Sequence, residues 1–242
     1  MTTVGFIYPG HAAEDDYPLA ERLLGPEIRL PVVHIYGTDL HAVDELIDLG
    51  SADKLADGAA RLRAVRPAAV VWACTSGSFV YGWEGARDQA ARLAEAAGVP
   101  ASSTSFAFVN ACRALNVKRV AVAASYPRDI ATRFVEFLAA GGVEVLALTS
   151  HGIDTAAEVG HLPTSAVLDL VAGNDHHEAD AVLVPDTAMR TFGLVPSLEN
   201  RLGKPVLTAN QVTIWEGLGL AGYSGTWRDA GALFRTPAGV FT

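Results

Sequence analysis

The sequence predicts an α/β fold of two Rossmann-like lobes, each with a parallel sheet, that face each other across a cleft. Two observations support this prediction. Short apolar runs alternate with segments of helical period, and the order of these features repeats once along the chain. Most of the runs lack polar alternation, as expected for parallel strands that helices cover on both faces. Such strand–helix alternation gives right-handed βαβ units and therefore a layered α/β sandwich.

Six apolar runs are predicted to be strands because they are short and rich in β-branched residues. In chain order they span residues 4–8, 31–35, 69–72, 119–122, 143–148 and 181–184. Helices are predicted between them where apolar residues recur every three to four positions. These positions are Leu55, Ala59 and Leu62 in one segment, Ala86, Ala90, Leu93 and Ala97 in the next, and Ile130, Phe134, Phe137 and Leu138 in a third.

The two halves of the chain resemble each other, which indicates an internal duplication. A strand that ends in Tyr-Pro occurs in each half, and Ala-Val-Val-Trp-Ala-Cys-Thr at 69–75 parallels Ala-Val-Leu-Val-Pro-Asp-Thr at 181–187. Gly-Val-Pro at 98–100 likewise parallels Gly-Lys-Pro at 203–205. Ligands of open α/β sheets bind beyond the carboxyl ends of the strands. The residues at these ends are therefore expected to meet in the cleft between the lobes.

The paired segments also suggest where the lobes begin and end. We expect residues 1–106 and 213–242 to form the first lobe and residues 107–212 to form the second. A helix predicted at 210–220 would then leave the second half and pack back on the first. The stretch after this helix has no clear period and is not assigned to an element.

Composition and charge exclude several classes of protein. The 242 residues include 18 Lys and Arg against 27 Asp and Glu, a net charge of −9, which argues against a nucleic-acid surface. No apolar run is long enough for a membrane span, and the first residues do not form a signal sequence. The two cysteines cannot form a disulfide framework, so a reducing cytoplasm is the expected location. A homo-oligomer is compatible with this sequence.

Cys74 and Asp186 are the candidate catalytic residues because each follows a buried strand at the matching place in its half. Small polar residues follow Cys74, as at the start of a helix, where free N–H groups stabilise a thiolate or a bound carboxylate. The alternatives are an inert buried thiol for Cys74 and a helix N-cap for Asp186. In the functional interpretation, Asp186 is an acid/base across the cleft from the thiol.

Other motifs carry less information. Tyr126 ends a strand, and its phenol could donate a hydrogen bond to a substrate carboxylate; the alternative is a tyrosine that only packs in the core. Cys112 is predicted to lie in the core. The Gly-x-Gly-x-x-Gly pattern at 217–222 closes a helix rather than opening one, so it is rejected as a dinucleotide site. The adjacent histidines at 176–177 lack the spacing of a helical metal pair. The charged segment at 11–16 is expected to be a solvated loop, with a place at the border of the cleft as its alternative. No metal site is predicted.

Several segments resemble the aspartate/glutamate racemase superfamily. They are Ala-Cys-Thr-Ser-Gly-Ser-Phe at 73–79, Ala-Ser-Tyr-Pro at 124–127 and Arg-Leu-Gly-Lys-Pro-Val at 201–206, together with the internal repeat. Within that superfamily the chain is similar to the branch of maleate cis–trans isomerases and arylmalonate decarboxylases. The resemblance implies an enzyme without a metal or organic cofactor that has one catalytic position in each lobe. Racemases and maleate isomerases carry cysteine at both positions, whereas the decarboxylases carry glycine first and cysteine second.

This chain departs from both patterns, with Cys74 at the first position and Asp186 at the second. The resemblance implies that hydroxyl groups and backbone N–H groups hold a substrate carboxylate beside them. The expected substrate-binding residues are Thr75, Ser76, Tyr126, Thr187 and Tyr8.

The leading functional prediction is a cofactor-independent isomerase or racemase of a small carboxylic or dicarboxylic acid, acting through Cys74 and an enediolate-like intermediate. Acid/base groups on both faces of a carbon give racemisation, whereas a single proton donor suits decarboxylation of a malonate-type acid. A cis–trans isomerase would instead add its thiolate to an alkene carbon. The alternatives are therefore an arylmalonate-like decarboxylase and a carboxylate-binding protein without turnover.

Overall fold

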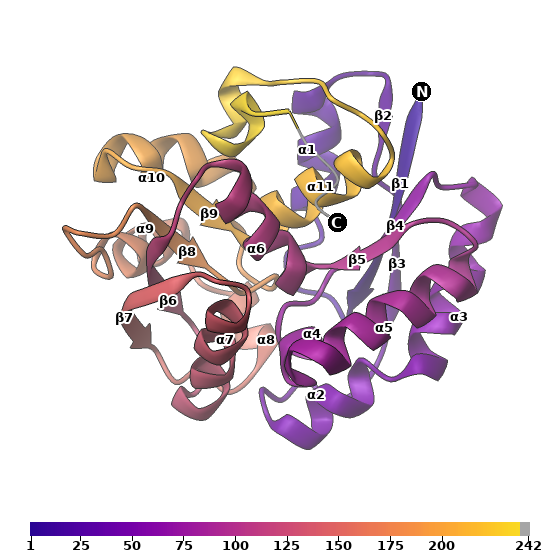
Figure 1. Cartoon of the computed structure of the whole chain (residues 1–242), viewed down its shortest axis with the longest axis horizontal. Coiled ribbons are helices and arrows are strands. Elements are labelled where there is room, and N and C mark those ends of the chain that lie inside the picture. The colour runs from indigo at the N-terminus through magenta and orange to yellow at the C-terminus, as the bar shows by residue number, and fades with distance from the viewer. Residues whose placement is uncertain (238–242) are drawn as a thin grey trace.

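The protein has two parallel sheets, each flanked by helices, in a computed structural model that describes residues 1–237 (Figure 1). The first sheet has the order β2-β1-β4-β5, and β3 pairs with β1 further along that strand. Its strands are β1 (Thr2–Pro9), β2 (Ile28–Arg29), β3 (Val32–Ile35), β4 (Ala69–Trp72) and β5 (Ala101–Ser103). All pairs between them are parallel.

The second sheet repeats the arrangement of the first. Its order is β7-β6-β8-β9, with every pair parallel, so it matches the order β3-β1-β4-β5 strand for strand. The strands are β6 (Arg119–Ala124), β7 (Glu144–Ser150), β8 (Ala181–Val184) and β9 (Val206–Thr208). The α/β class and the two lobes with parallel sheets are therefore confirmed.

The six predicted strands are all present, but β2, β5 and β9 were not predicted as strands. They have only two or three residues each, which is too short for a periodic pattern. Both β5 and β9 also follow a helix that ends at a glycine in the left-handed region, Gly98 with φ 71° and Gly203 with φ 67°. A glycine adopts this conformation without steric cost, which explains why the paired Gly-x-Pro segments end helices in both halves.

The helices of the first half include the two predicted from periodicity, α3 and α5. Their bounds are α1 (Asp16–Leu24), α2 (Val43–Leu49), α3 (Ala52–Leu62), α4 (Ser76–Phe79), α5 (Gly82–Ala97) and α6 (Thr104–Ala114). The third predicted helix is α7 of the second half. The bounds there are α7 (Arg128–Ala140), α8 (Ala156–Gly160), α9 (Thr164–Ala172), α10 (Val195–Leu202) and α11 (Ala209–Leu220). No helix within the described range of residues is long and apolar enough to cross a membrane.

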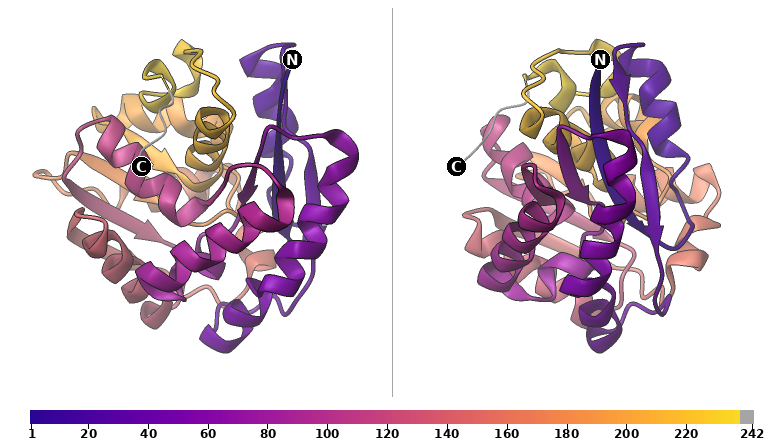
Figure 2. Two further views of the ribbon diagram at one scale, coloured as in Figure 1. Left: turned by 45° about the vertical axis from the view of Figure 1, so that its right-hand side comes forward. Right: turned by 90° about the vertical axis from the view of Figure 1, so that its right-hand side faces the viewer.

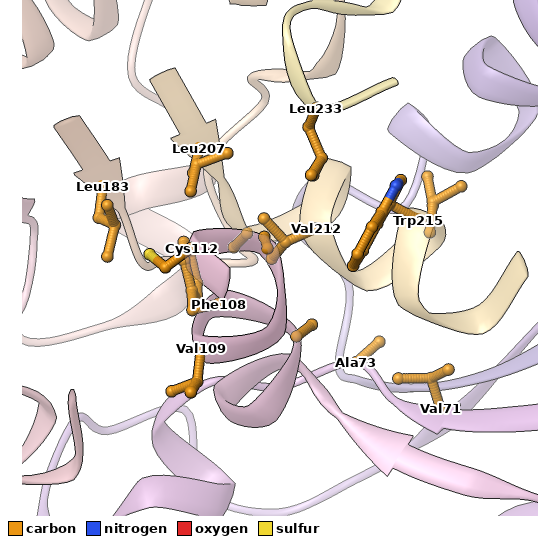
Figure 3. Close-up of a cluster of buried hydrophobic side chains, with 14 of the residues drawn as sticks. Val71, Ala73, Phe108, Val109, Cys112, Leu183, Leu207, Val212, Trp215 and Leu233 are labelled. Carbon is orange, nitrogen blue, oxygen red and sulfur yellow. The ribbon is translucent and has the colours of Figure 1, made fainter. Parts of the chain in front are cut away.

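The helices α6 and α11 form the centre of the molecule, between the two sheets (Figures 1 and 2). Helix α11 contacts β4 and β5, as expected of a helix that returns to the first half, and nearly all of its residues are buried. Cys112 lies in the core beside Phe108, facing Leu183 of β8, as predicted (Figure 3). The exact lobe boundaries remain a prediction, and residues 238–242 of the proposed first lobe lie outside the described residues.

Gly217, the first glycine of the 217–222 pattern, serves packing. Gly217 lies within α11, where a Cβ atom would come within 2.5 Å of Val4 Cγ1 on β1. The absence of a side chain therefore lets the helix approach the first sheet closely. This finding supports the rejection of a dinucleotide site. Beyond α11, the unassigned stretch makes two 3₁₀ turns, Arg228–Ala230 and Leu233–Arg235.

Candidate active site

A small cavity lies where the strands of both sheets end, and residues of α2, α4 and α8 contribute to its lining. Its volume is about 40 Å³, which holds about three water molecules. The residues that line it are Tyr8, Pro9, Thr38, Asp39, Leu40, His41, Leu46, Leu49, Cys74, Ser76, Ala156, Asp186, Thr187 and Ala188. The strand ends of the two halves thus contribute to one shared cavity, and among them are both candidate catalytic residues.

Cys74 directly follows β4 and is buried, with a side chain held by the turn that leads into α4. Its Sγ atom accepts a hydrogen bond from the Gly77 N–H at 3.3 Å and lies 3.8 Å from Ser76 Oγ. Burial raises the pKa of the Cys74 thiol to about 11, although the Gly77 and Ser76 hydrogen bonds oppose this. The negative charge of Asp186 raises it further. At neutral pH the sulfur therefore carries a proton, which suits a proton donor.

Asp186 occupies the equivalent place after β8 and is also buried. Its carboxylate accepts hydrogen bonds from the Ser125 hydroxyl and, at 2.9 Å, from the Ala188 N–H. These two bonds fix the orientation of the group. Its charge is among the causes that raise the pKa values of Cys74, Tyr8 and Tyr126, so these groups share one electrostatic environment.

The predicted carboxylate-binding hydroxyls occupy different positions relative to the cavity. Ser76 lines it, whereas Thr75 and Tyr126 are not among its lining residues. Thr75 Oγ1 is buried without a hydrogen-bond partner of standard geometry among the described residues. The Tyr126 hydroxyl donates to the Pro185 carbonyl at 2.7 Å, and burial raises its pKa well above 10. Roles for Thr75 and Tyr126 in substrate binding stay predictions.

Tyr8 and Thr187 line the cavity and connect the two halves. The Tyr8 hydroxyl donates to the Thr187 carbonyl at 2.7 Å and accepts from the Ala13 N–H at 3.0 Å. Because the hydroxyl makes both bonds within the protein, Tyr8 acts here as a wall of the cavity. Its predicted contact with substrate remains a prediction.

Sequence reasoning missed the loop before α2, which covers the cavity. The His41 N–H donates to the Asp154 carbonyl at 2.8 Å, and Leu40 bridges to Thr155. His41 Nδ1 donates to the Ile153 carbonyl at 2.9 Å, since a carbonyl can only accept. The signal available in the sequence was position, because the loop follows a predicted parallel strand at its carboxyl end.

Comparison with known proteins places the chain in a family. The family model "Arylmalonate decarboxylase" matches residues 5–234. An arylmalonate decarboxylase from Bordetella bronchiseptica is 32% identical over 175 residues, which is 70% of this chain and 72% of that protein. The chain belongs to the arylmalonate decarboxylase family.

Members of the arylmalonate decarboxylase family and maleate isomerases share this fold. A maleate isomerase from Geobacillus stearothermophilus is 26% identical over 189 residues, 78% of this chain and 74% of that protein. The solved structure of a liganded arylmalonate decarboxylase double mutant, with one glycine replaced by cysteine and one cysteine by serine, is 27% identical. The superposition covers 97% of this chain and 99% of the mutant's chain, with a TM-score of 0.86. Among the residues that line the cavity of the present protein, one is a cysteine, Cys74.

Proposed function

We propose that the protein is a cofactor-independent isomerase or racemase of a small carboxylic or dicarboxylic acid. The observation that carries the proposal is the shared cavity, in which a protonated thiol from one half and a carboxylate from the other are both present. Two acid/base groups of this kind suit proton transfer on opposite faces of one carbon. Both cysteines are free thiols, which favours the reducing cytoplasm as the location.

The proposed reaction begins with the substrate carboxylate beside Ser76 and Thr75, whose hydroxyls donate hydrogen bonds to it. Asp186 removes the proton from the α-carbon, and the electron pair moves onto the carboxylate oxygens as an enediolate. Preorganised donors stabilise that charge, each worth about 3 kcal/mol. The Cys74 thiol then gives its proton to the opposite face of the carbon. Asp186 is left protonated and Cys74 ionised, and the reverse sequence or exchange with solvent restores both.

The cavity as described is closed to substrate. A volume of about 40 Å³ is far below that of a drug-sized pocket, about 300 Å³ or more, and is room for a few water molecules rather than for a chiral acid. Any substrate would therefore require the 38–41 loop, which lines the cavity, to move outward. Short-chain acids, which require the least movement, are the first candidates for assay.

Solvent isotope exchange tests the proposal. In D₂O, a racemase should place deuterium on the α-carbon of both enantiomers of its acid, as followed by NMR. Asp186→Asn should abolish exchange, because an amide keeps the size of the side chain and accepts no proton. Exchange at the wild-type rate in Asp186→Asn would contradict the assignment of the base.

A decarboxylase is the second candidate, and the high pKa of Cys74 favours it as well, since an enediolate formed by loss of CO₂ needs only one proton donor. Release of CO₂ from a substituted malonate, with one product enantiomer, would support this function. A carboxylate-binding protein without turnover would show neither exchange nor CO₂ release across a panel of acids that it binds.

A further inference from the structure

A group of metal-ligating side chains lies outside the cavity, at the carboxyl ends of β1 and β3. His11, Glu14 and His34 each offer one ligand atom, and these atoms all lie within 4.8 Å of one another. His11 and Glu14 belong to the loop after β1, and His34 belongs to β3, where it pairs with Tyr8. The two imidazole rings are neighbours, with centroids 4.0 Å apart and ring planes tilted by 31° to each other. None of the three residues lines the cavity.

Bonds to the backbone hold one polar atom of His34 and one of Glu14, so that the second ligand atom of each makes no bond to the backbone of the described residues. His34 Nδ1 donates to the Gly10 carbonyl at 2.6 Å, and this leaves Nε2 with its lone pair. Glu14 Oε2 accepts from the Ala12 N–H at 2.8 Å, and its other oxygen faces His11.

His11 has a side-chain hydrogen-bond partner at each of its two ring nitrogens. Its Nδ1 lies 2.8 Å from Glu14 Oε1, and its Nε2 lies 3.2 Å from the Tyr36 hydroxyl. An ion bound at Nδ1 would take the place of the shared proton, while Nε2–H would still donate to Tyr36. Histidines that bind metals nearly always donate their other N–H to such an outer partner, which fixes ring orientation and tautomer.

We propose that His11, Glu14 and His34 bind a zinc ion, with water at a fourth position. Two imidazole nitrogens and one carboxylate oxygen form a donor set typical of zinc, whereas magnesium and calcium prefer sites made of oxygen. Tetrahedral zinc with bonds of about 2.0–2.1 Å requires ligand atoms about 3.3 Å apart. The side chains must therefore converge by up to about 1.5 Å. The side chain of His11 is 58% exposed, so it has the freedom to do this.

The bound ion would act as a clip between β3 and the loop after β1. That loop supports the cavity wall, because the Ala13 N–H donates to the Tyr8 hydroxyl. Asp15, which follows Glu14 in the same segment, forms an ion pair with Arg190 of the second half at 2.9 Å. Zinc is thus expected to stabilise the fold next to the cavity, without contact with Cys74 or Asp186.

Isothermal titration of the metal-free full chain with zinc chloride tests the proposal. We expect one ion per chain and a higher unfolding temperature of the loaded protein. His34→Gln should weaken binding by more than about 100-fold, because it removes a ligand. Tyr36→Phe should weaken it by about 10-fold, because it removes only an outer partner.

Three variants exclude other zinc sites. His161→Gln removes an exposed histidine of the second half, His176→Gln breaks the adjacent pair there, and Cys74→Ser removes the cavity thiol. Each should bind zinc as tightly as the wild type, and magnesium chloride should give no signal. Binding that survives in folded His34→Gln, that is lost in one of these three variants, or that is absent at millimolar zinc overturns the proposal.

Discussion

The Cys74 side chain has the properties of a buried acid rather than of a reactive thiolate. Burial raises its pKa to about 11, and the Asp186 charge acts in the same direction. A sulfur that keeps its proton at pH 7 is ready to donate it to a carbanion-like intermediate. It is poorly suited to attack a substrate until that proton is removed.

Replacing the sulfur should therefore remove catalysis without removing the fold. Cys74→Ser is expected to lower kcat by about 10²- to 10⁴-fold, the usual contribution of a positioned acid. Steady-state kinetics measures this, and circular dichroism confirms folding. Cys112→Ala is the matched control, because this second buried cysteine lies in the core and its loss should cost only about 1 kcal/mol of stability. Near-normal turnover by Cys74→Ser would refute the role of the thiol.

The pKa of Cys74 can be read from its alkylation by iodoacetamide. Only the thiolate reacts, so the rate should still rise about tenfold per pH unit between pH 9 and pH 10. An ordinary thiol is already half ionised at its pKa near 8.5, so its alkylation rate rises little over the same interval. The Cys112→Ala background leaves a single cysteine to label. A plateau below pH 9 would show that the thiol is not shielded as described.

At this scale the sequence predicted the residues at strand ends and missed those in loops. Cys74 and Asp186 closely follow apolar runs, so strand direction alone predicts that each lies at the carboxyl edge of its own sheet. His41 and Asp39 lie in the loop before α2, and their place over the cavity depends on contacts with residues 153–157. Such contacts span more than a hundred positions and leave no local pattern.

At the scale of helices and strands, the packing of α11 against β1 depends on the absence of a side chain at Gly217. Gly217 allows the helix to lie against β1, where an added methyl group would come within 2.5 Å of Val4 Cγ1. Gly217→Ala should lower the free energy of unfolding by about 1–3 kcal/mol through overpacking. Urea denaturation measures this change.

A double-mutant cycle supplies the control for Gly217. Val4→Ala removes the clashing methyl groups, so the double variant should lose less stability than the sum of the two single variants. Strict additivity would place the strain elsewhere. The helix itself was predictable, but its burial on all sides was not, because α11 lacks the one-sided apolar face that a sequence pattern detects.

Across the whole molecule, one buried carboxylate joins the halves. Asp16 Oδ2, at the start of α1, accepts hydrogen bonds from the N–H groups of Thr191 and Phe192 at 3.0 and 3.2 Å. Asn210 Nδ2 of α11 donates to the same oxygen at 3.0 Å. Burial raises the pKa of Asp16, and these three bonds oppose that rise.

Loss of this acceptor should destabilise the protein far more than loss of its neighbour. Asp16→Ala leaves three donors without their partner, so we expect a loss of about 3 kcal/mol in the free energy of unfolding. Asp15→Ala breaks only the exposed pair with Arg190 and should cost at most about 1 kcal/mol. Chemical denaturation of both variants makes the comparison. Equal effects would mean that the buried contact contributes little.

The arrangement of the molecule was the most predictable level, because the duplicated order of segments appears directly in the sequence. The repeat at 69–75 and 181–187 implied two equivalent sheets, and the strand orders β3-β1-β4-β5 and β7-β6-β8-β9 agree with it. The convergence of His11 with His34 could not be predicted, since it requires knowing that β3 pairs with β1 in one particular register.

The duplication supplies two equivalent positions, yet this chain fills them with chemically unlike groups. In the proposed racemisation, one mirror-image form of the acid would lose its proton to oxygen and the other to sulfur. Thermodynamics nevertheless demands the same kcat/KM for both forms, since enantiomers have equal free energies in water. If the two directions differ in kcat, their KM values must therefore differ by the same factor. It would also give primary isotope effects of different size in the two directions.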